Sequence, residues 1–271
     1  MNSCFRRRGR TVDVGLHAIT NYAPKGSRRG PLARVLRQLR LGWEELALAP
    51  QIGSAIVFPG VTLRFSNDFE LLRSEVHRNF PREKDNFERL LAALLDYRNF
   101  GQPSGRCSAR QLVGGIVNDP LLVEMLLCPI MFYGGSREDD IDFDLFSILF
   151  RSIFLEGLAR PAAGVRVLLG ALVRKFRQLG GELRLRSGVS KLAVRQGRVE
   201  GVILEDGRKL RAGNVLSSAG WAETVRLCDD VNTPPRPACI SFVESISILD
   251  AQPRELGLEL AMVFFNDSEQ F

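Results

Sequence analysis

The chain has 271 residues, of which 45% are hydrophobic and 25% are charged. These values are typical of a globular protein with an ample core, in one large domain or two modest ones. The five cysteines are scattered without a C-x-x-C pair, and there are only two histidines. This composition argues against a disulfide framework and against a zinc or histidine-based metal site, and it fits a reducing cytosol.

The net charge of +6 is concentrated at the amino-terminal end. Residues 1–40 carry ten lysines and arginines against one acid, a local charge of +9, which leaves −3 for the other 231 residues. A basic end of this kind can attract nucleic acid or an anionic membrane surface. No aromatic-rich RNA motif or helix-turn-helix pattern accompanies it, so we expect no nucleic-acid partner. Membrane-surface contact is favoured if the substrate is lipophilic, and a solvated face is the default.

No segment has the pattern of a signal peptide or a membrane span. Met1–Arg10 contains no apolar stretch after its charges. The most apolar segments, Leu121–Tyr133 and Leu145–Leu158, are interrupted by charged residues or proline, so neither offers the run of about 18 apolar residues that a spanning helix needs. We therefore expect a cytoplasmic protein, with peripheral membrane contact through the basic region as the alternative.

The first half of the chain predicts short strands mixed with amphipathic helices. Thr11–His17 is typical of a strand that enters a glycine turn. Further on, apolar residues recur at helical spacing, and Ser66-Asn67-Asp68 supplies polar side chains for a helix start. The expected elements are a basic helix at Pro31–Leu41, two strands within Ser54–Phe65 around Pro59-Gly60, helices at Phe69–Phe80 and Lys84–Tyr97 separated by Pro81, a loop at Gln102–Gly105, and a helical hairpin through Ala109–Val117 and Leu121–Leu127.

Two middle segments each allow a functional and a structural interpretation. Ser136–Asp144 contains five carboxylates, which invites a calcium loop, but it lacks the central glycine and terminal glutamate of an EF-hand. A solvated loop and helix start is preferred there. Leu145–Leu158 places Phe150 and Phe154 on a broad apolar face. That face would suit a long apolar ligand, although a buried core helix explains it more simply.

The stretch Gly164–Gly220 is the most informative part of the chain. An apolar helix face from Val165 to Phe176 ends at Gly180-Gly181, because glycine accepts the left-handed conformation of a helix C-cap. Strands are expected at Glu182–Arg186, Val189–Val194, Val199–Leu204 after Gln196-Gly197, Lys209–Arg211 after the Asp206-Gly207 turn, and Asn214–Ser218. Two further strands are expected at Ala238–Leu249 and Leu258–Phe265. Pattern alone is equally compatible with an ordinary α+β segment and with a cofactor-binding one.

This order of elements, with the sequences GGELRL, GVSKL, GRVEGV, EDGR and NVLSSA, resembles the second cofactor segment of the phytoene desaturase, carotenoid isomerase and retinol saturase group of flavoproteins, within the amine-oxidase-like superfamily. Asp13, Gly15 and His17 resemble the D-x-G-x-H element of the same group. The resemblance implies a mixed α/β fold: a partial Rossmann-like FAD domain, split into residues 1–22 and 160–225, with an inserted substrate domain of mixed sheet and helices in residues 23–159 and 226–271.

The resemblance also implies site residues. Asp13 and Gly15 would lie on the flavin side, Val189 would contact the adenine through its backbone, and Ser218, Ala219 and Gly220 would border the cofactor, since a strand ending in small residues lets a cofactor approach beyond its carboxyl end. The substrate would meet His17, Phe150 and Phe154. No general base and no metal ligand is identified.

The function implied is an FAD-dependent oxidation, reduction or isomerisation of carbon–carbon bonds in a lipophilic polyene. The sequence contains no G-x-G-x-x-G, the motif whose helix N-terminus faces the pyrophosphate. We therefore expect that the chain is incomplete, and a non-catalytic fragment that does not bind FAD alone is the first alternative. An amine oxidase-type flavoenzyme is the second. The substrate, the direction of the reaction, the electron acceptor and the oligomeric state stay open.

Overall fold

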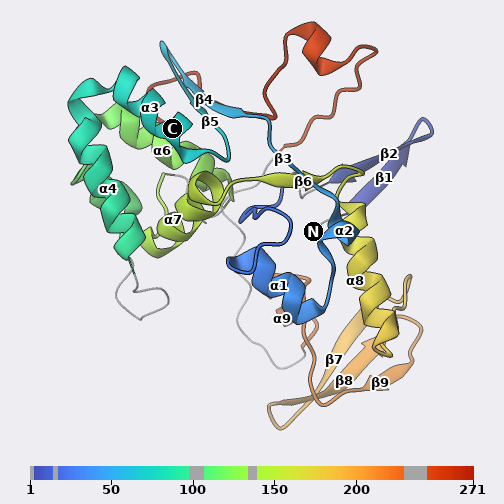
Figure 1. Ribbon diagram of the computed structural model, residues 1–271. Helices are drawn as coiled ribbons and strands as arrows, with labels where there is room; N and C mark the ends of the chain where they lie inside the picture. Colours follow the sequence, from blue (N-terminus) through green and yellow to red (C-terminus); the bar gives the residue numbers. More distant parts are fainter. Residues whose placement is uncertain (1–2, 15–17, 98–106, 134–138, 229–242) are drawn as a thin grey trace. The chain divides into compact units, whose positions relative to one another are not determined.

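The computed structural model describes residues 3–14, 18–97, 107–133, 139–228 and 243–271. Helices alternate with several small sheets, so the fold is α/β, as predicted (Figure 1). The chain divides into two compact units, residues 1–175 with 242–271 and residues 176–241, with the boundary inside one helix. This division does not test which residues share a cofactor domain, and that assignment stays a prediction.

The larger unit begins with an antiparallel hairpin, β1 (Ser3–Arg7) and β2 (Arg10–Val14). Helices α1 (Pro31–Leu39) and α2 (Trp43–Leu46) follow, and β3 (Leu48–Pro50) pairs with β6 (Ala159–Pro161). The remaining helices are α3 (Phe69–Asn79), a 3₁₀ turn at Pro81–Glu83, α4 (Lys84–Asp96), α5 (Ala109–Gly114), α6 (Pro120–Tyr133), α7 (Phe143–Phe150) with a π-helical turn at Arg151–Leu155, and α8 (Arg166–Gln178).

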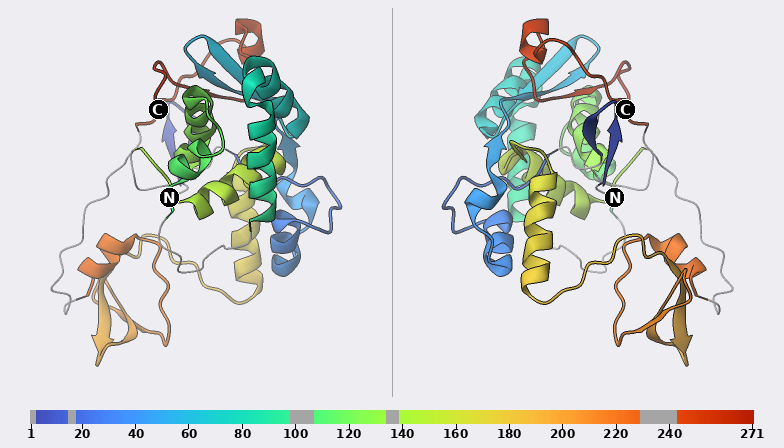
Figure 2. Two further views of the ribbon diagram at one scale, coloured as in Figure 1. Left: turned by 90° about the vertical axis from the view of Figure 1, so that its left-hand side faces the viewer. Right: turned by 90° about the vertical axis from the view of Figure 1, so that its right-hand side faces the viewer.

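A three-stranded sheet with the order β10-β4-β5 anchors the core of this unit. β4 (Ser54–Phe58) and β5 (Val61–Phe65) form the hairpin predicted around Pro59-Gly60, and β10 (Met262–Phe265) lies parallel to β4. Helices α3, α4, α6 and α7 gather beside these strands, as Figures 1 and 2 show. The core is rich in phenylalanine, because Phe65, Phe154 and Phe150 pack edge to face at centroid distances of 5.1 and 5.0 Å.

Charged and polar residues in this core have specific partners. Glu124 lies in the otherwise apolar helix α6 and is only 8% exposed, but it forms an ion pair with Arg110 of α5. A buried carboxylate needs such a partner. Cys128 lies on the same helix, and burial raises the pKa of its thiol to about 12. We infer no reactivity for it, since only the thiolate is nucleophilic.

The smaller unit is built on the predicted β-meander. β7 (Val189–Arg195), β8 (Arg198–Leu204) and β9 (Lys209–Arg211) form an antiparallel sheet, followed by α9 (Trp221–Arg226). The predicted end of the helix at Gly180-Gly181 is also confirmed. Gly180 has φ +84°, and its N–H donates to the carbonyl of Arg177 at 3.0 Å. Helix α8 therefore ends where the sequence indicates.

Three of the predicted strands are wrong. Glu182–Arg186, Asn214–Ser218 and the described part of Ala238–Leu249, residues 243–249, have no strand structure. Their apolar side chains are largely in solvent, with Leu185 75% and Leu216 100% exposed. An extended segment becomes a strand only when a neighbouring strand accepts its backbone hydrogen bonds. Among the described residues no strand pairs with these three segments.

The stability of the larger unit should depend strongly on Gly157. It follows the π-helical turn with φ +91°, and a Cβ there would lie 2.3 Å from Oδ1 of Asn67. We expect Gly157→Ala to lower the free energy of unfolding by about 3–5 kcal/mol, from strain at positive φ plus lost hydrogen bonds of Asn67. Gly60→Ala is the matched control, since Gly60 has φ +74° and open space around it. Equal losses in urea unfolding of the two variants would contradict this account.

A second prediction concerns Tyr97, whose hydroxyl hydrogen-bonds to the carboxylate of Asp144 and so links the end of α4 to α7. This bond, with lesser help from burial, raises the pKa of Tyr97 from 10.0 to about 12. The folded state therefore favours the neutral phenol. The stabilisation that this hydrogen bond gives to the folded state is fully present below pH 10 and is lost as the pH rises through 12. Tyr97→Phe should cost about 1–2 kcal/mol of unfolding free energy at pH 7. A cost that does not shrink in alkaline solution would contradict the assignment.

Candidate functional site

The candidate site is the place where β2 meets the start of α8. Asp13 lies near the end of β2, and its side chain is 9% exposed. Its Oδ1 lies 2.8 Å from Nε of Arg166, in the first turn of α8. Gly164 completes the cluster, because a Cβ at this position would lie 2.7 Å from Oδ2 of Asp13. The ion pair thus joins two segments some 150 residues apart in the sequence. Position 164 needs a glycine, because a side chain there would collide with the Asp13 carboxylate.

A second set of contacts holds the following segment against the π-helical turn. Asn21, in a left-handed conformation with φ +60°, donates from Nδ2 to Oγ of Ser152 at 2.9 Å and to the carboxylate of Glu156. The N–H of Tyr22 donates to the carbonyl of Gly157 at 3.1 Å. Irregular turns of this kind often occur at functional sites, so this junction is the part of the larger unit where we look for function.

Asn67 secures the other side of the same turn. Its side chain accepts from the N–H of Leu158 at 2.8 Å and donates to the carbonyl of Leu158 at 3.0 Å. Gln51 donates to the same Oδ1 at 2.8 Å and accepts from the hydroxyl of Ser54 at 2.7 Å. Ser54 is fully buried. The backbone leading from the turn to β6 and α8 is therefore fixed by a satisfied polar network.

The predicted cofactor residues of the second segment lie in the smaller unit. Val189 begins β7 and is 37% exposed, and Ser218, Ala219 and Gly220 form an exposed segment before α9. Gly220 has φ +100° and is the residue at the helix start. Asp13 belongs to the larger unit. Gly15 and His17 lie outside the described residues, so their role stays a prediction.

The two phenylalanines assigned to the substrate are core residues in this structure. Phe150 is fully buried and Phe154 is 1% exposed. Both belong to the main hydrophobic cluster, where Phe150 also contacts Phe146 with centroids 5.9 Å apart. Packing alone accounts for their position, which is the simpler of the two sequence interpretations. A further contact with substrate stays a prediction.

The acidic segment before α7 is structural where it is described. Asp142 caps α7 by accepting from the N–H of Asp144 at 3.0 Å. Asp140 accepts from the N–H groups of Arg110 and Ile141. Burial acts to raise the pKa of Asp140, but the hydrogen bonds from Ser108, Arg110 and Ile141 together outweigh it and lower the pKa. No group of three or more metal-ligating side chains occurs within the described ranges. The cap at Asp142 confirms the expected helix start.

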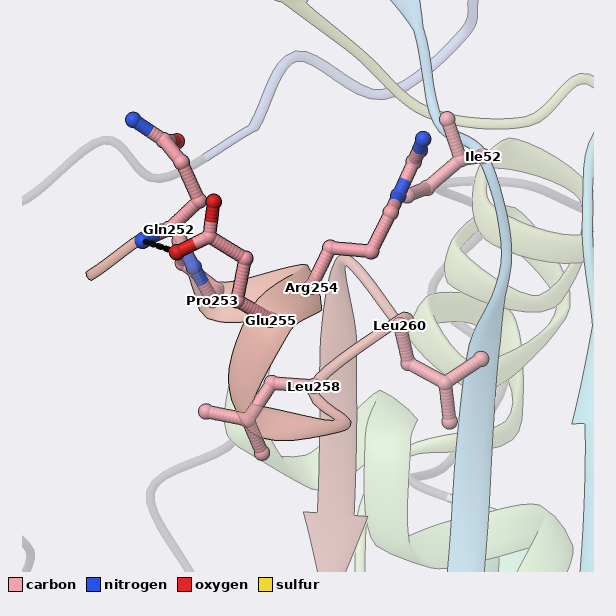
Figure 3. Close-up of a pocket in the computed structure, with 7 residues that line it drawn as sticks. All are labelled: Ile52, Gln252, Pro253, Arg254, Glu255, Leu258 and Leu260. Carbon is pink, nitrogen blue, oxygen red and sulfur yellow. Dashed lines mark hydrogen bonds between the residues drawn. The ribbon is translucent and has the colours of Figure 1, made fainter.

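One open pocket of about 650 Å³ lies beside the 3₁₀ turn Pro253–Leu256 (Figure 3). Apolar side chains of Ile52, Leu258 and Leu260 line it, together with Gln252, Pro253, Arg254 and Glu255. The N–H of Gln252 donates to Oε2 of Glu255 at 3.2 Å, which closes the turn upon itself. Because Ile52 is 68% and Leu258 58% exposed, this pocket does not bury a ligand as binding sites usually do.

Sequence comparison gives partial matches to phytoene desaturases. The chain is 26% identical over 193 residues to phytoene desaturase (lycopene-forming) of Pseudescherichia vulneris, covering 62% of this chain and 38% of that protein. It is 36% identical over 81 residues to phytoene desaturase of Fusarium fujikuroi, covering 29% of this chain and 14% of that protein. The chain is similar to phytoene desaturases. It spans well under half the length of these relatives, and no family profile matches it.

Structural comparison gives a matching fold. An oxidoreductase from Methanosarcina mazei superimposes with a TM-score of 0.59 at 21% identity, over 85% of this chain and 53% of that one. The PF1083 protein of Pyrococcus furiosus superimposes with a TM-score of 0.53 at 17% identity, over 83% of this chain and 51% of that one. These similarities establish the fold of most of the chain, which spans about half of each solved structure.

Sequence reasoning identified Asp13 but missed its partners. Arg166 lies in a helix that was predicted from its apolar positions alone, and Asn21 lies in a segment without periodicity. A basic residue two positions after Gly164, in the first turn of a helix, was the available signal, because cations are disfavoured at helix N-termini. Arg166 is explained by the carboxylate that it contacts.

The ion pair between Asp13 and Arg166 can be tested by a double-mutant cycle. We expect Asp13→Asn and Arg166→Gln to be coupled by about 1–3 kcal/mol in unfolding free energy, because Asp13 is nearly buried. The pair Asp206–Arg208 is the matched control, at 2.7 Å but with both side chains at least half exposed, and its coupling should be much weaker because solvent screens it. Equal couplings would show that the Asp13 pair is an ordinary surface contact.

Proposed function

We propose that the chain is part of an FAD-dependent oxidoreductase that acts on carbon–carbon bonds of a lipophilic, polyene-like substrate by desaturation, saturation or isomerisation. The observation that carries the proposal is the similarity to a phytoene desaturase over 193 residues, 62% of this chain. The fold, shared over 85% of the chain with an oxidoreductase, supports it.

The contacts around Asp13 agree with the proposed split of the FAD domain. The resemblance assigns residues 1–22 and 160–225 to one domain, although more than 130 residues separate them. In the structure Asp13 binds Arg166, and the N–H of Ile19 donates to the carbonyl of Ala159 at 2.7 Å. The amino-terminal segment therefore pairs with the chain that enters the proposed second part of the domain.

The described residues fit a flavin site only in part. Oδ2 of Asp13 occupies the space beside Gly164, and the Asp13 carboxylate is already engaged by Arg166. Before α9, the hydroxyl of Ser217 accepts from the N–H of Ala219 at 3.3 Å and contacts the hydroxyl of Thr224. The sequence has no glycine-rich phosphate motif of the G-x-G-x-x-G type. We therefore derive no reaction step through a flavin held by these residues alone.

A second candidate, a chain that does not bind FAD by itself, is favoured by its exposed apolar side chains. Leu216 and Val243 are fully exposed and Trp221 is 77% exposed. Large apolar side chains in solvent commonly mark surfaces that another part of a protein covers. Nothing in the part of the chain that the structure describes favours an amine substrate.

The proposal is tested on the longest reading frame that contains this chain. We expect the purified protein to carry a flavin whose absorption bleaches, or whose re-oxidation accelerates, when a polyene in detergent micelles is added without oxygen. Product analysis by chromatography would then show an altered number or geometry of double bonds. A flavin that responds to amines and not to polyenes would contradict the proposed polyene substrate. A folded protein without bound flavin would contradict the proposal that the protein is a flavoenzyme.

A further inference from the structure

Helix α1 presents a surface that combines arginine with exposed aliphatic side chains. Val35 is 47% and Leu39 37% exposed, and their spacing of four residues places them on the same helix face. Exposed arginines flank this pair along the helix and the segment before it. We call these residues the α1 surface: Arg28, Arg29, Arg34, Val35, Arg37, Leu39 and Arg40.

The neighbouring face of α1 is already used by the core. Ala33 and Leu36 are buried, at 6% and 3% exposure. Leu36 packs in a second hydrophobic cluster with Leu41, Leu46 and Ala171, so the helix is held against α2 and α8. Val35 and Leu39 do not belong to this cluster. The apolar face of α1 is therefore only partly packed inward, and Val35 and Leu39 form an exposed margin of it.

The arginines of the α1 surface have no acidic partner within 4.0 Å among the residues that the structure places. The neighbouring Lys25 differs, because it lies 2.7 Å from Glu44. Arg37 donates to the carbonyl of Arg28, a neutral group. Five like charges within 13 residues repel one another, and an external anionic surface would relieve this repulsion.

We propose that the α1 surface binds the anionic surface of a lipid bilayer. Arginine side chains keep their charge at the level of the headgroups while their stems, with Val35 and Leu39, enter the apolar boundary. A nucleic acid would use the charges, but it would gain little from the two aliphatic side chains, and the α1 surface offers no aromatic ring for base stacking. The combination of charge and aliphatic exposure favours lipid.

This inference does not require a flavin or an identified substrate. It would bring the protein to the place where a lipophilic substrate is dissolved. Because lipid binding can be measured on the protein without its cofactor, a failure of the α1 proposal and a failure of the proposed function can be told apart.

The test is sedimentation with vesicles of phosphatidylcholine alone or mixed with phosphatidylglycerol. We expect binding only to the anionic vesicles, and weaker binding as salt rises. The triple variant Arg28→Gln, Arg29→Gln, Arg34→Gln removes three charges and no side-chain hydrogen bond of the described structure. At about fivefold per arginine, its partitioning should fall roughly 100-fold. Val35→Ser with Leu39→Ser should lower partitioning by about tenfold with all charges kept.

The matched control neutralises three exposed arginines of the meander, Arg195, Arg198 and Arg211, to glutamine. Its partitioning should stay within about twofold of the unmodified protein if the α1 surface makes the contact. An equal loss in both triple variants, no binding to anionic vesicles, or tighter binding to a DNA or RNA duplex that is insensitive to the Val35 and Leu39 changes would each overturn the proposal. Circular dichroism of every variant confirms that it is folded.

Discussion

The phenylalanine packing between β5 and the end of α7 is the constraint on which the larger unit depends. Phe65 and Phe154 meet edge to face at 5.1 Å, and Phe264 of β10 stacks on Phe65 at 6.2 Å. This packing fixes the π-helical turn that contains Phe154. The residues that follow the turn, Gly157 and Leu158, therefore lie against Asn67. β6 and the start of α8 follow within a few residues. The position of Arg166, and so its contact with Asp13, rests on a buried aromatic cluster.

The sequence predicts best where local chemistry decides the structure. The turn at Pro59-Gly60, the cap at Asp68, the stop at Gly180 and the meander through Asp206-Gly207 all depend on a few adjacent residues, and each is observed. Strand assignments failed where a partner strand was needed. Asn214–Ser218 has the composition of a buried strand, but Leu216 is fully exposed, because composition does not reveal which backbone will accept the hydrogen bonds.

The candidate site shows the same limit. Asp13 was identified through a resemblance, whereas Arg166, Asn21 and Asn67 act through contacts between segments that lie far apart in the sequence. No periodicity or motif reports such contacts. The charge pattern was informative in a different way, since an excess of arginine near the amino-terminal end predicts an anion-binding surface and the structure adds which side chains are exposed. Within the described ranges, no helix combines the length and the hydropathy of a membrane span.

The proposed function requires a flavoprotein whose cofactor domain is split along the chain. The partial fit of the described residues means that cofactor retention is the most direct test. FAD should be measured by absorption and by release on denaturation, in the purified protein made from the longest reading frame that contains this chain. The account predicts about one FAD for each polypeptide, since the proposed domain has a single dinucleotide site. A folded protein that neither retains FAD nor takes it up on addition would contradict it.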